Sequence, residues 1–139
     1  MIITDISKLT KKSEKVYEIT QEIVDICKQL KKECLENNGA GLAAPQLGYL
    51  YRIIYIKAYD ICLINPEITS KEGIRYAREG CLSLPNQTFL VERPTKVKVV
   101  SEILELRRKG FKFRDLDAAV VCHEIDHLDG ITIDQKALL

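Results

Sequence analysis

The first strong pattern of apolar positions runs over residues 13–37. Apolar side chains recur there at steps of three and four, the spacing of one helix face: Val16, Ile19, Ile23, Ile26, Cys27, Leu30 and Cys34. Ser13 carries a hydroxyl suited to an N-cap, and the Asn-Asn-Gly sequence at 37–39 tolerates the left-handed backbone that ends helices. The sequence therefore predicts an amphipathic helix over 13–37, with Cys27 and Cys34 as small core residues rather than metal ligands.

After a loop at 39–48 the pattern becomes that of short strands, rich in β-branched residues. We expect Pro66 to end one of them and Lys109-Gly110 to form a tight hairpin turn. The predicted strands cover residues 52–56, 61–64, 72–76, 89–93, 96–100, 104–108 and 111–114.

A second helix is predicted from Asp115, as N-cap, to about Leu128, where Asp129-Gly130 gives a stop. The last nine residues leave no room for another long helix. One helix, many short strands and a second helix indicate an α+β fold. In it, a mostly antiparallel sheet packs around the second helix, and the N-terminal amphipathic helix is added to that unit.

Composition narrows the class of protein. A chain of 139 residues predicts one domain, 1–139. The 21 basic and 20 acidic residues give a net charge of +1, which argues against direct nucleic-acid or membrane binding. No apolar run approaches the roughly 18 residues that span a bilayer, and the N-terminus lacks the layout of a secretion signal. Five cysteines, an odd number, favour free thiols or a thiolate ligand in a reducing cytoplasm.

The strongest chemical signal is His123-Glu124-Ile125-Asp126-His127, which contains both histidines of the chain. Residues four apart lie on one helix face, so the two imidazoles can share one metal ion. The carboxylate of Glu124 can then reach a water on that metal, as in metal-assisted hydrolysis. The plain alternative is a solvated helix that carries this pattern by chance.

Two histidines leave a hydrolytic metal one protein ligand short. Cys122 lies about 100° around the helix from His123, and Asp126 precedes His127 by one residue, so neither faces the same ion. The best source is the segment 79–85, where Gly80 gives the backbone latitude and Cys81 supplies a thiol. From the residues alone, Cys81 is either the third ligand or a buried structural cysteine.

The segment Gly39–Gln46 holds two glycines, small residues and a glutamine. It lacks the Gly-Lys-Ser/Thr ending of phosphate-binding loops. Its simplest interpretation is a helix stop followed by a packed loop. Alternatively, its backbone passes close to a ligand, and the side-chain amide of Gln46 donates to a developing oxyanion.

Together the three segments resemble the peptide deformylase family. Its motifs G-x-G-L-A-A-P-Q, E-G-C-L-S and H-E-x-D-H appear intact and in order as Gly39–Gln46, Glu79–Ser83 and His123–His127. Ile64-Asn65-Pro66 and Arg93 also match, so the resemblance covers residues 37–135. The chain resembles a short form of the family, without its Pro-Asp-x-x-Leu-Arg opening and lacking a C-terminal helix after Lys136.

The resemblance implies a role for each matching residue. Cys81, His123 and His127 would bind one divalent metal, natively Fe²⁺, with Zn²⁺ or Ni²⁺ possible after purification. Glu124 would be the general base and acid, and the Gln46 amide and the Leu82 backbone N–H would hold the oxyanion. Further pocket or supporting residues are Ala40, Gly41, Gly80 and the ion pair of Glu79 with Arg93. Leu116, Ala119 and Val120 either line a pocket for a methionine side chain or belong to the core.

The implied reaction is removal of formate from the N-terminal formyl-methionine of nascent polypeptides. We expect a cytoplasmic monomer, bacterial or phage-encoded in a host, that can associate transiently with the ribosome. Two other interpretations remain. Another H-E-x-x-H hydrolase, such as a peptidase, would need its own third ligand after His127. A non-catalytic, metal-stabilised fold would need four protein ligands and no use for Glu124.

Overall fold

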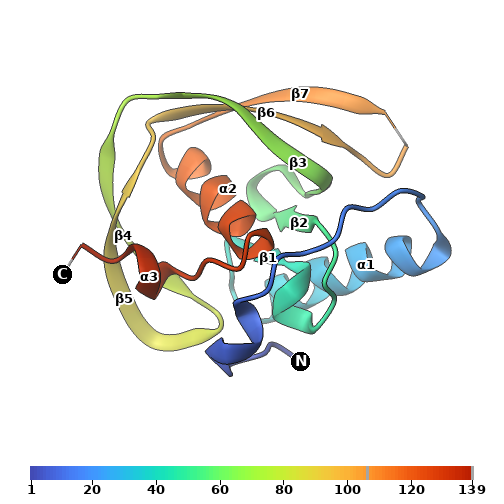
Figure 1. Cartoon of the computed structure of the whole chain (residues 1–139), viewed down its shortest axis with the longest axis horizontal. Helices are drawn as coiled ribbons and strands as arrows, with labels where there is room; N and C mark the ends of the chain where they lie inside the picture. Colours follow the sequence, from blue (N-terminus) through green and yellow to red (C-terminus); the bar gives the residue numbers. More distant parts are fainter. Residues whose placement is uncertain (106, 139) are drawn as a thin grey trace.

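The computed structural model describes residues 1–105 and 107–138 and has the predicted α+β architecture (Figure 1). A five-stranded sheet has the order β1-β2-β3-β6-β7, and all its neighbouring strands are antiparallel. A separate two-stranded antiparallel ribbon is formed by β4 and β5. The strands are β1 (Gly41–Ala43), β2 (Ile53–Ile56), β3 (Ile61–Glu72), β4 (Arg75–Cys81), β5 (Leu84–Arg93), β6 (Lys96–Glu102) and β7 (Arg108–Arg114).

Three α-helices accompany the strands: α1 (Gln21–Glu36), α2 (Asp115–Leu128) and the single turn α3 (Ile133–Lys136). Three 3₁₀ helices lie at η1 (Ile6–Leu9), η2 (Ala44–Leu47) and η3 (Lys57–Tyr59). In the part of the chain that the structure describes, no helix is long and apolar enough to cross a membrane.

The core has two parts, one on each side of strand β2. Ile54 and Ile56 pack with α2 and with β3, β6 and β7 in one cluster. Ile53 and Tyr55 pack against α1 in the other cluster. Because side chains alternate along a strand, a strand covered on both faces is apolar throughout, which explains why all four residues of β2 are buried. Cys27 and Cys34 lie in the second cluster, as predicted.

Helix α1 begins later than predicted. Its N-cap is Thr20, whose hydroxyl accepts from the backbone N–H of Ile23 at 3.4 Å, rather than Ser13. Residues 13–19 are not helical: Glu14 forms an isolated β-bridge with Tyr51, and the Ser13 N–H donates to the carbonyl of Leu128 at 2.8 Å. At the other end the prediction is confirmed, because α1 stops at Glu36 and Asn38 has a φ of 56°.

The strand boundaries also need correction. Pro66 does not end β3, which continues to Glu72 through a register shift between Ile64 and Glu67. Asn65 takes a φ of 52° there, and its side chain binds the backbone N–H and carbonyl of Val16 at 2.8 and 2.7 Å. The single strand predicted at 72–76 is interrupted: β3 ends at Glu72, Gly73 has a φ of 74°, and β4 begins at Arg75.

The predicted hairpin turn at Lys109-Gly110 is wrong, because both residues lie inside β7 and pair with β6. The chain reverses earlier, with a turn at Leu104 and Glu105. One residue of the strand predicted at 104–108, Leu106, lies outside the described residues.

Helix α2 ends at Leu128 as predicted, with Gly130 at a φ of 75° beyond it. Its cap is Arg114, one residue before the predicted Asp115. A single helical turn, α3, lies within the last nine residues, where no long helix was predicted, and it packs against β4 and β5.

Candidate metal centre and substrate pocket

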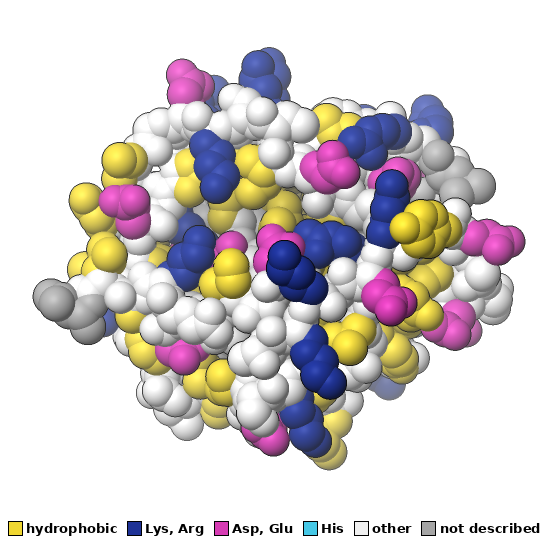
Figure 2. Space-filling view, viewed as in Figure 1, with side chains coloured by type: hydrophobic (Ala, Val, Ile, Leu, Met, Phe, Trp, Pro, Cys, Tyr) yellow, Lys and Arg dark blue, Asp and Glu magenta, His cyan; other side chains and the backbone are white. Residues whose placement is uncertain are grey.

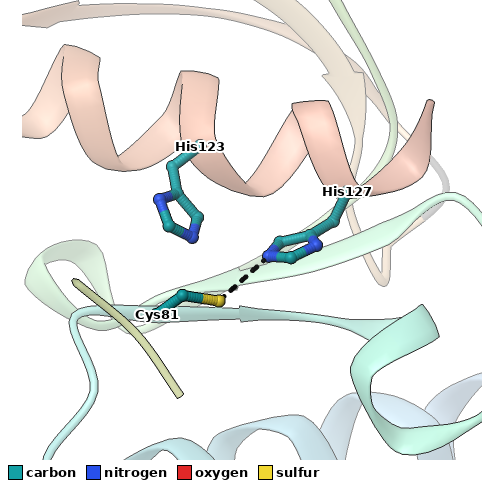
Figure 3. Close-up of side chains that lie close together, drawn as sticks. All are labelled: Cys81, His123 and His127. Atoms are coloured by element: carbon teal, nitrogen blue, oxygen red, sulfur yellow. Dashed lines mark hydrogen bonds between the residues drawn. The ribbon is translucent and has the colours of Figure 1, made fainter. Parts of the chain in front are cut away.

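Cys81, His123 and His127 bring their ligand atoms together, all within 4.8 Å of one another. Figure 3 shows the two rings on one face of helix α2, pointing toward the sulfur of Cys81. The Cys81 Sγ lies 3.4 Å from His127 Nε2. Both histidines are buried, and neither is visible on the mixed-charge face in Figure 2. A soft thiolate and two imidazoles form a donor set that would suit a divalent transition metal.

The two kinds of ligand reach this point by different local structures. The helix places His123 and His127 one turn apart, as their spacing predicts. Cys81 is the last residue of β4 and pairs with Leu84 across a two-residue turn. A register shift between Glu79 and Cys81 interrupts the ladder just before this turn. Irregularities of this kind re-aim side chains next to functional sites, and here the thiol is turned toward α2.

The ring of His123 is oriented by a chain of charged groups. Its Nδ1 lies 3.0 Å from Glu79 Oε1, so an Nδ1–H donated to that carboxylate leaves Nε2 free for the cluster. Arg93 donates from Nε and Nη2 to both oxygens of Glu79 at 2.9 Å. The same guanidinium donates from Nη1 to Asp126 Oδ2 at 2.7 Å. The predicted ion pair of Glu79 with Arg93 is therefore present and extends to Asp126.

Burial and neighbouring charges set the protonation of these groups. Burial tends to raise the pKa of Glu79, but the hydrogen bonds from His123 and Arg93 outweigh it and lower that pKa to about 2. Burial, with a contribution from His123, lowers the pKa of His127 to about 3, so this ring is neutral and can coordinate a cation. For His123, burial favours the neutral ring, whereas Glu124 and Cys81 raise the pKa to about 10. A divalent cation bound at its Nε2 would displace that proton.

Glu124 lies beside the cluster and is not engaged by the protein. It is 5% exposed, and within residues 1–105 and 107–138 its Oε1 has no hydrogen-bond partner. Burial raises its pKa to about 7, which suits a group that exchanges a proton near neutral pH. Its other oxygen lies against Gly41, where an added Cβ would come within 3.0 Å of Oε2 and 2.9 Å of the Tyr55 carbonyl. The glycine at position 41 is therefore required by this close approach.

Gln46 directs its side-chain amide nitrogen toward the ligand cluster. Its Oε1 accepts from the backbone N–H of Ala43 at 3.0 Å, which fixes the orientation of the amide. Its Nε2 then donates to Ser83 Oγ at 3.0 Å and lies 3.5 Å from Cys81 Sγ. Ser83 is 1% exposed, and its role as the partner of Gln46 was not predicted from the sequence. Its place at the end of the E-G-C-L-S motif is the one signal that pointed to it.

A family model described as polypeptide deformylase matches residues 2–137. This chain belongs to the peptide deformylase family. The peptide deformylase of Thermoanaerobacter pseudethanolicus is 41% identical over 132 residues, which cover 94% of this chain and 83% of the relative. That of Caldicellulosiruptor bescii is 44% identical over 136 residues, which cover 94% of this chain and 80% of the relative.

Solved structures of the family have the same fold. The peptide deformylase of Thermotoga maritima superposes with a TM-score of 0.95 at 26% identity, covering 100% of this chain and 97% of that one. A probable peptide deformylase from Synechococcus phage S-SSM7 gives 0.88 at 35% identity, with 98% of each chain covered. The predicted family, fold class and deformylase activity are thereby confirmed at the level of the family, whose members depend on a metal.

In this family member, a pocket of about 640 Å³ opens beside the ligand cluster. Leu116 is exposed at its edge, Ala119 is buried in its wall, and Val120 both lines it and packs against the core. The pocket and core interpretations of these three residues are thus compatible. The other predicted site residues that line it are Ala40, Gly41, Gln46, Glu79, Gly80, Cys81, Leu82, His123 and Glu124.

Two glycines of the deformylase motifs behave differently from each other. An added Cβ at Gly39 would come within 2.8 Å of Leu82 Cδ1 and 3.3 Å of Cys34 Sγ, so the first motif is tightly packed. At Gly80 the nearest atom would be the Gln87 carbonyl at 3.5 Å, an ordinary contact. The protein atoms around Gly80 therefore do not by themselves require a glycine at this position.

Proposed function

We propose that this chain hydrolyses the formyl group of N-terminal formyl-methionine on nascent polypeptides and releases formate. The observation that carries the proposal is the convergence of Cys81, His123 and His127 beside a buried, unpartnered Glu124 in one pocket. Within the described residues, these three are the only group of ligand side chains clustered closely enough to hold a metal.

Cys81, His123 and His127 would hold one divalent ion. Their donor set suits iron, zinc or nickel, and we propose Fe²⁺ as the native ion, with Zn²⁺ or Ni²⁺ in purified protein. Such an ion, when bound, lowers the pKa of water toward 7 and polarises a carbonyl oxygen. Glu79 keeps Nε2 of His123 directed at the ion through its bond to Nδ1.

Glu124 is proposed to move the proton. Its unpartnered Oε1 accepts a proton from the attacking water and later delivers it to the leaving amine. A raised pKa near neutrality allows the same carboxyl group to act first as base and then as acid.

Gln46 is proposed to stabilise the charge that develops on the formyl oxygen. Its Nε2 is aimed by the bond that fixes Oε1 on Ala43, and the backbone N–H of Leu82 is proposed as the second donor. Each donor of this kind contributes roughly 3–4 kcal/mol of transition-state stabilisation. Because a formyl group carries only hydrogen on its carbon, the backbone of Ala40, Gly41 and Gly80 can lie close to it. The methionine side chain would lie along Leu116, Ala119 and Val120.

The remaining features of the function are also proposals. We propose that residues 1–139 form a single catalytic domain that acts as a monomer in the cytoplasm, of a bacterium or of a phage host. A transient association with the ribosome would bring it to its substrates. The nearly balanced net charge of +1 argues against direct binding to nucleic acid or membranes.

The test supplies freshly prepared protein, loaded with Fe²⁺ or Ni²⁺, with formyl-Met-Ala-Ser and with unformylated Met-Ala-Ser. We expect formate and a new amine from the first peptide and no reaction with the second. Cleavage of the unformylated peptide would instead indicate a peptidase, and no reaction with either would contradict the proposal.

The matched variant is Glu124→Gln, which keeps size and shape but cannot accept the proton. We expect it to retain one metal per chain and to lose roughly 10²–10⁴-fold in kcat. Turnover close to that of the wild type would remove Glu124 from the mechanism. Loss of the metal in this variant would show that the effect comes from the site's structure rather than from proton transfer.

A further inference from the structure

The pocket extends beyond what formyl-methionine needs. From the ligand cluster it reaches the strands of the β4–β5 ribbon, where Arg78, Gln87 and Thr88 line its outer part. Its volume of about 640 Å³ falls in the range of pockets that enclose drug-sized ligands. If the proposed function holds, the substrate chain after methionine leaves the cluster past this outer part.

Arg78 is an exposed residue of β4 at the pocket. Exposure alternates along the strand: Glu79 and Cys81 are half-buried toward α2, while Arg78 and Gly80 are exposed, and all four residues line the pocket. Within the described residues, the recorded hydrogen bond of its guanidinium is one from Nη1 to Thr88 Oγ1 at 3.4 Å. Directly across the ribbon lies Leu90, which offers no charge. Most of the five N–H donors of Arg78 therefore remain open to a ligand.

Among the described residues that line the pocket, Arg78 carries the positive charge that no carboxylate neutralises. Among the described lining residues it is the single Lys or Arg side chain. Of the two carboxylates there, Glu79 is bound by Arg93 and His123, and Glu124 is buried at the cluster. Glu92 pairs with Tyr76, two cross-strand pairs away from the Arg78–Leu90 pair. Among the ion pairs of the described residues, none within 4.0 Å joins a carboxylate to the Arg78 guanidinium.

We infer that Arg78 is a specificity-determining residue that binds a carboxylate of the substrate downstream of formyl-methionine. This inference rests on the proposed function and adds a substrate class to it: formyl peptides with an acidic group shortly after the first residue. Arginine binds a carboxylate with two parallel N–H donors. The amides and hydroxyls around Arg78 are neutral, so they do not compete with a carboxylate for its guanidinium. Arg78 lies away from the reacting atoms, so the preference should appear in KM rather than in kcat.

The test compares C-terminally amidated formyl-Met peptides that carry a single Glu, Gln or Lys at the second, third or fourth position. At the position that reaches Arg78, we expect kcat/KM for Glu to exceed that for Lys by about two- to fivefold, as for an exposed ion pair. The ratio should shrink when the salt concentration is raised. At each length, the peptide with a free C-terminal acid is also compared with its amide. This distinguishes binding of the terminal carboxylate from binding of an acidic side chain.

Arg78→Glu should reverse the preference toward Lys, and Arg78→Gln should bring the Glu-to-Lys ratio close to one. The control is Lys28→Glu, which makes the same change in net charge on the exposed face of α1 and should leave the wild-type ratio unchanged. Equal kcat/KM for Glu, Gln and Lys at every position, or an unchanged ratio in Arg78→Glu, would overturn the inference alone. No formate from any peptide would overturn the proposed function together with it.

Discussion

The ligand cluster joins two parts of the molecule that are built very differently. Helix α2 supplies both histidines and has nine of its 14 residues buried. The β4–β5 ribbon supplies the thiol, yet β4 has no fully buried residue, and its Tyr76 is 62% exposed. A two-stranded ribbon alone is only marginally stable in water. The position of His123 and His127 is therefore fixed by core packing, whereas that of Cys81 depends on whatever ties the ribbon to the helix.

Arg93 is a buried tie between the two parts. It is the last residue of β5, is 3% exposed, and binds Glu79 on the ribbon and Asp126 on α2 at once. Helix α3 also packs against β4 and β5 from the C-terminal side (Figure 1). Core packing therefore preforms the histidine half of the cluster, while a buried charge network holds the cysteine half in place.

The largest expected effects come from removing one ligand from each part. Cys81→Ala and His127→Ala should both abolish stoichiometric metal binding and most activity, because two remaining ligands hold a divalent ion poorly. Their stabilities should differ. His127 is 1% exposed, so losing its ring should cost the metal-free protein about 2 kcal/mol, whereas Cys81→Ala should cost less than about 1 kcal/mol.

Metal content by elemental analysis and urea unfolding of the metal-free variants measure these two effects. Equal destabilisation by the two substitutions would contradict the contrast between a packed helix and a peripheral ribbon. Full metal binding by Cys81→Ala would contradict its place in the ligand set.

The next largest effect is expected from removing Arg93, which joins the ribbon to α2. Arg93→Ala takes the buried guanidinium away from Glu79 and Asp126. These carboxylates keep His123 and the exposed Lys136 as partners. Breaking a buried pair in this way costs about 3–5 kcal/mol. The control is Arg108→Ala, whose pairs with Glu67 and Glu102 are exposed and should contribute less than about 1 kcal/mol. Urea unfolding measures both. Similar small losses in the two variants would mean that the ribbon is held by other contacts.

The difference between the packed helix and the peripheral ribbon also explains which parts of the site can be predicted from the sequence. Helical spacing alone places His123 and His127 on one face, because both lie in one regular, buried helix. The contact of Cys81 with His127 joins residues 46 positions apart through a ribbon and an irregular strand end, which no local pattern encodes. The resemblance to the deformylase motifs supplied that ligand. It did not supply Ser83 or the bond from Arg93 to Asp126, which appear only once the elements are packed.

The fold shows a similar division between local and long-range causes. The ends of α2 and the C-terminal end of α1 follow from local cap and stop residues, within one position. The start of α1 does not, because Val16 has helical spacing but is held outside the helix by Asn65, a residue 49 positions away. The hairpin turn predicted at Lys109-Gly110 failed for a related reason: the register with β6 places that glycine inside a strand, opposite Val100.

The smallest expected effect separates the predicted from the observed start of α1. Thr20→Ala removes the hydroxyl that accepts from Ile23 N–H and should lower the free energy of unfolding by about 1 kcal/mol. Ser13→Ala should change it by less than about 0.5 kcal/mol or raise it, because the Ser13 hydroxyl is buried without a partner in the described residues. Urea unfolding of both variants measures the difference. A larger loss from Ser13→Ala than from Thr20→Ala would place the N-cap at residue 13 and extend the helix to the predicted start, against the contacts of the non-helical segment.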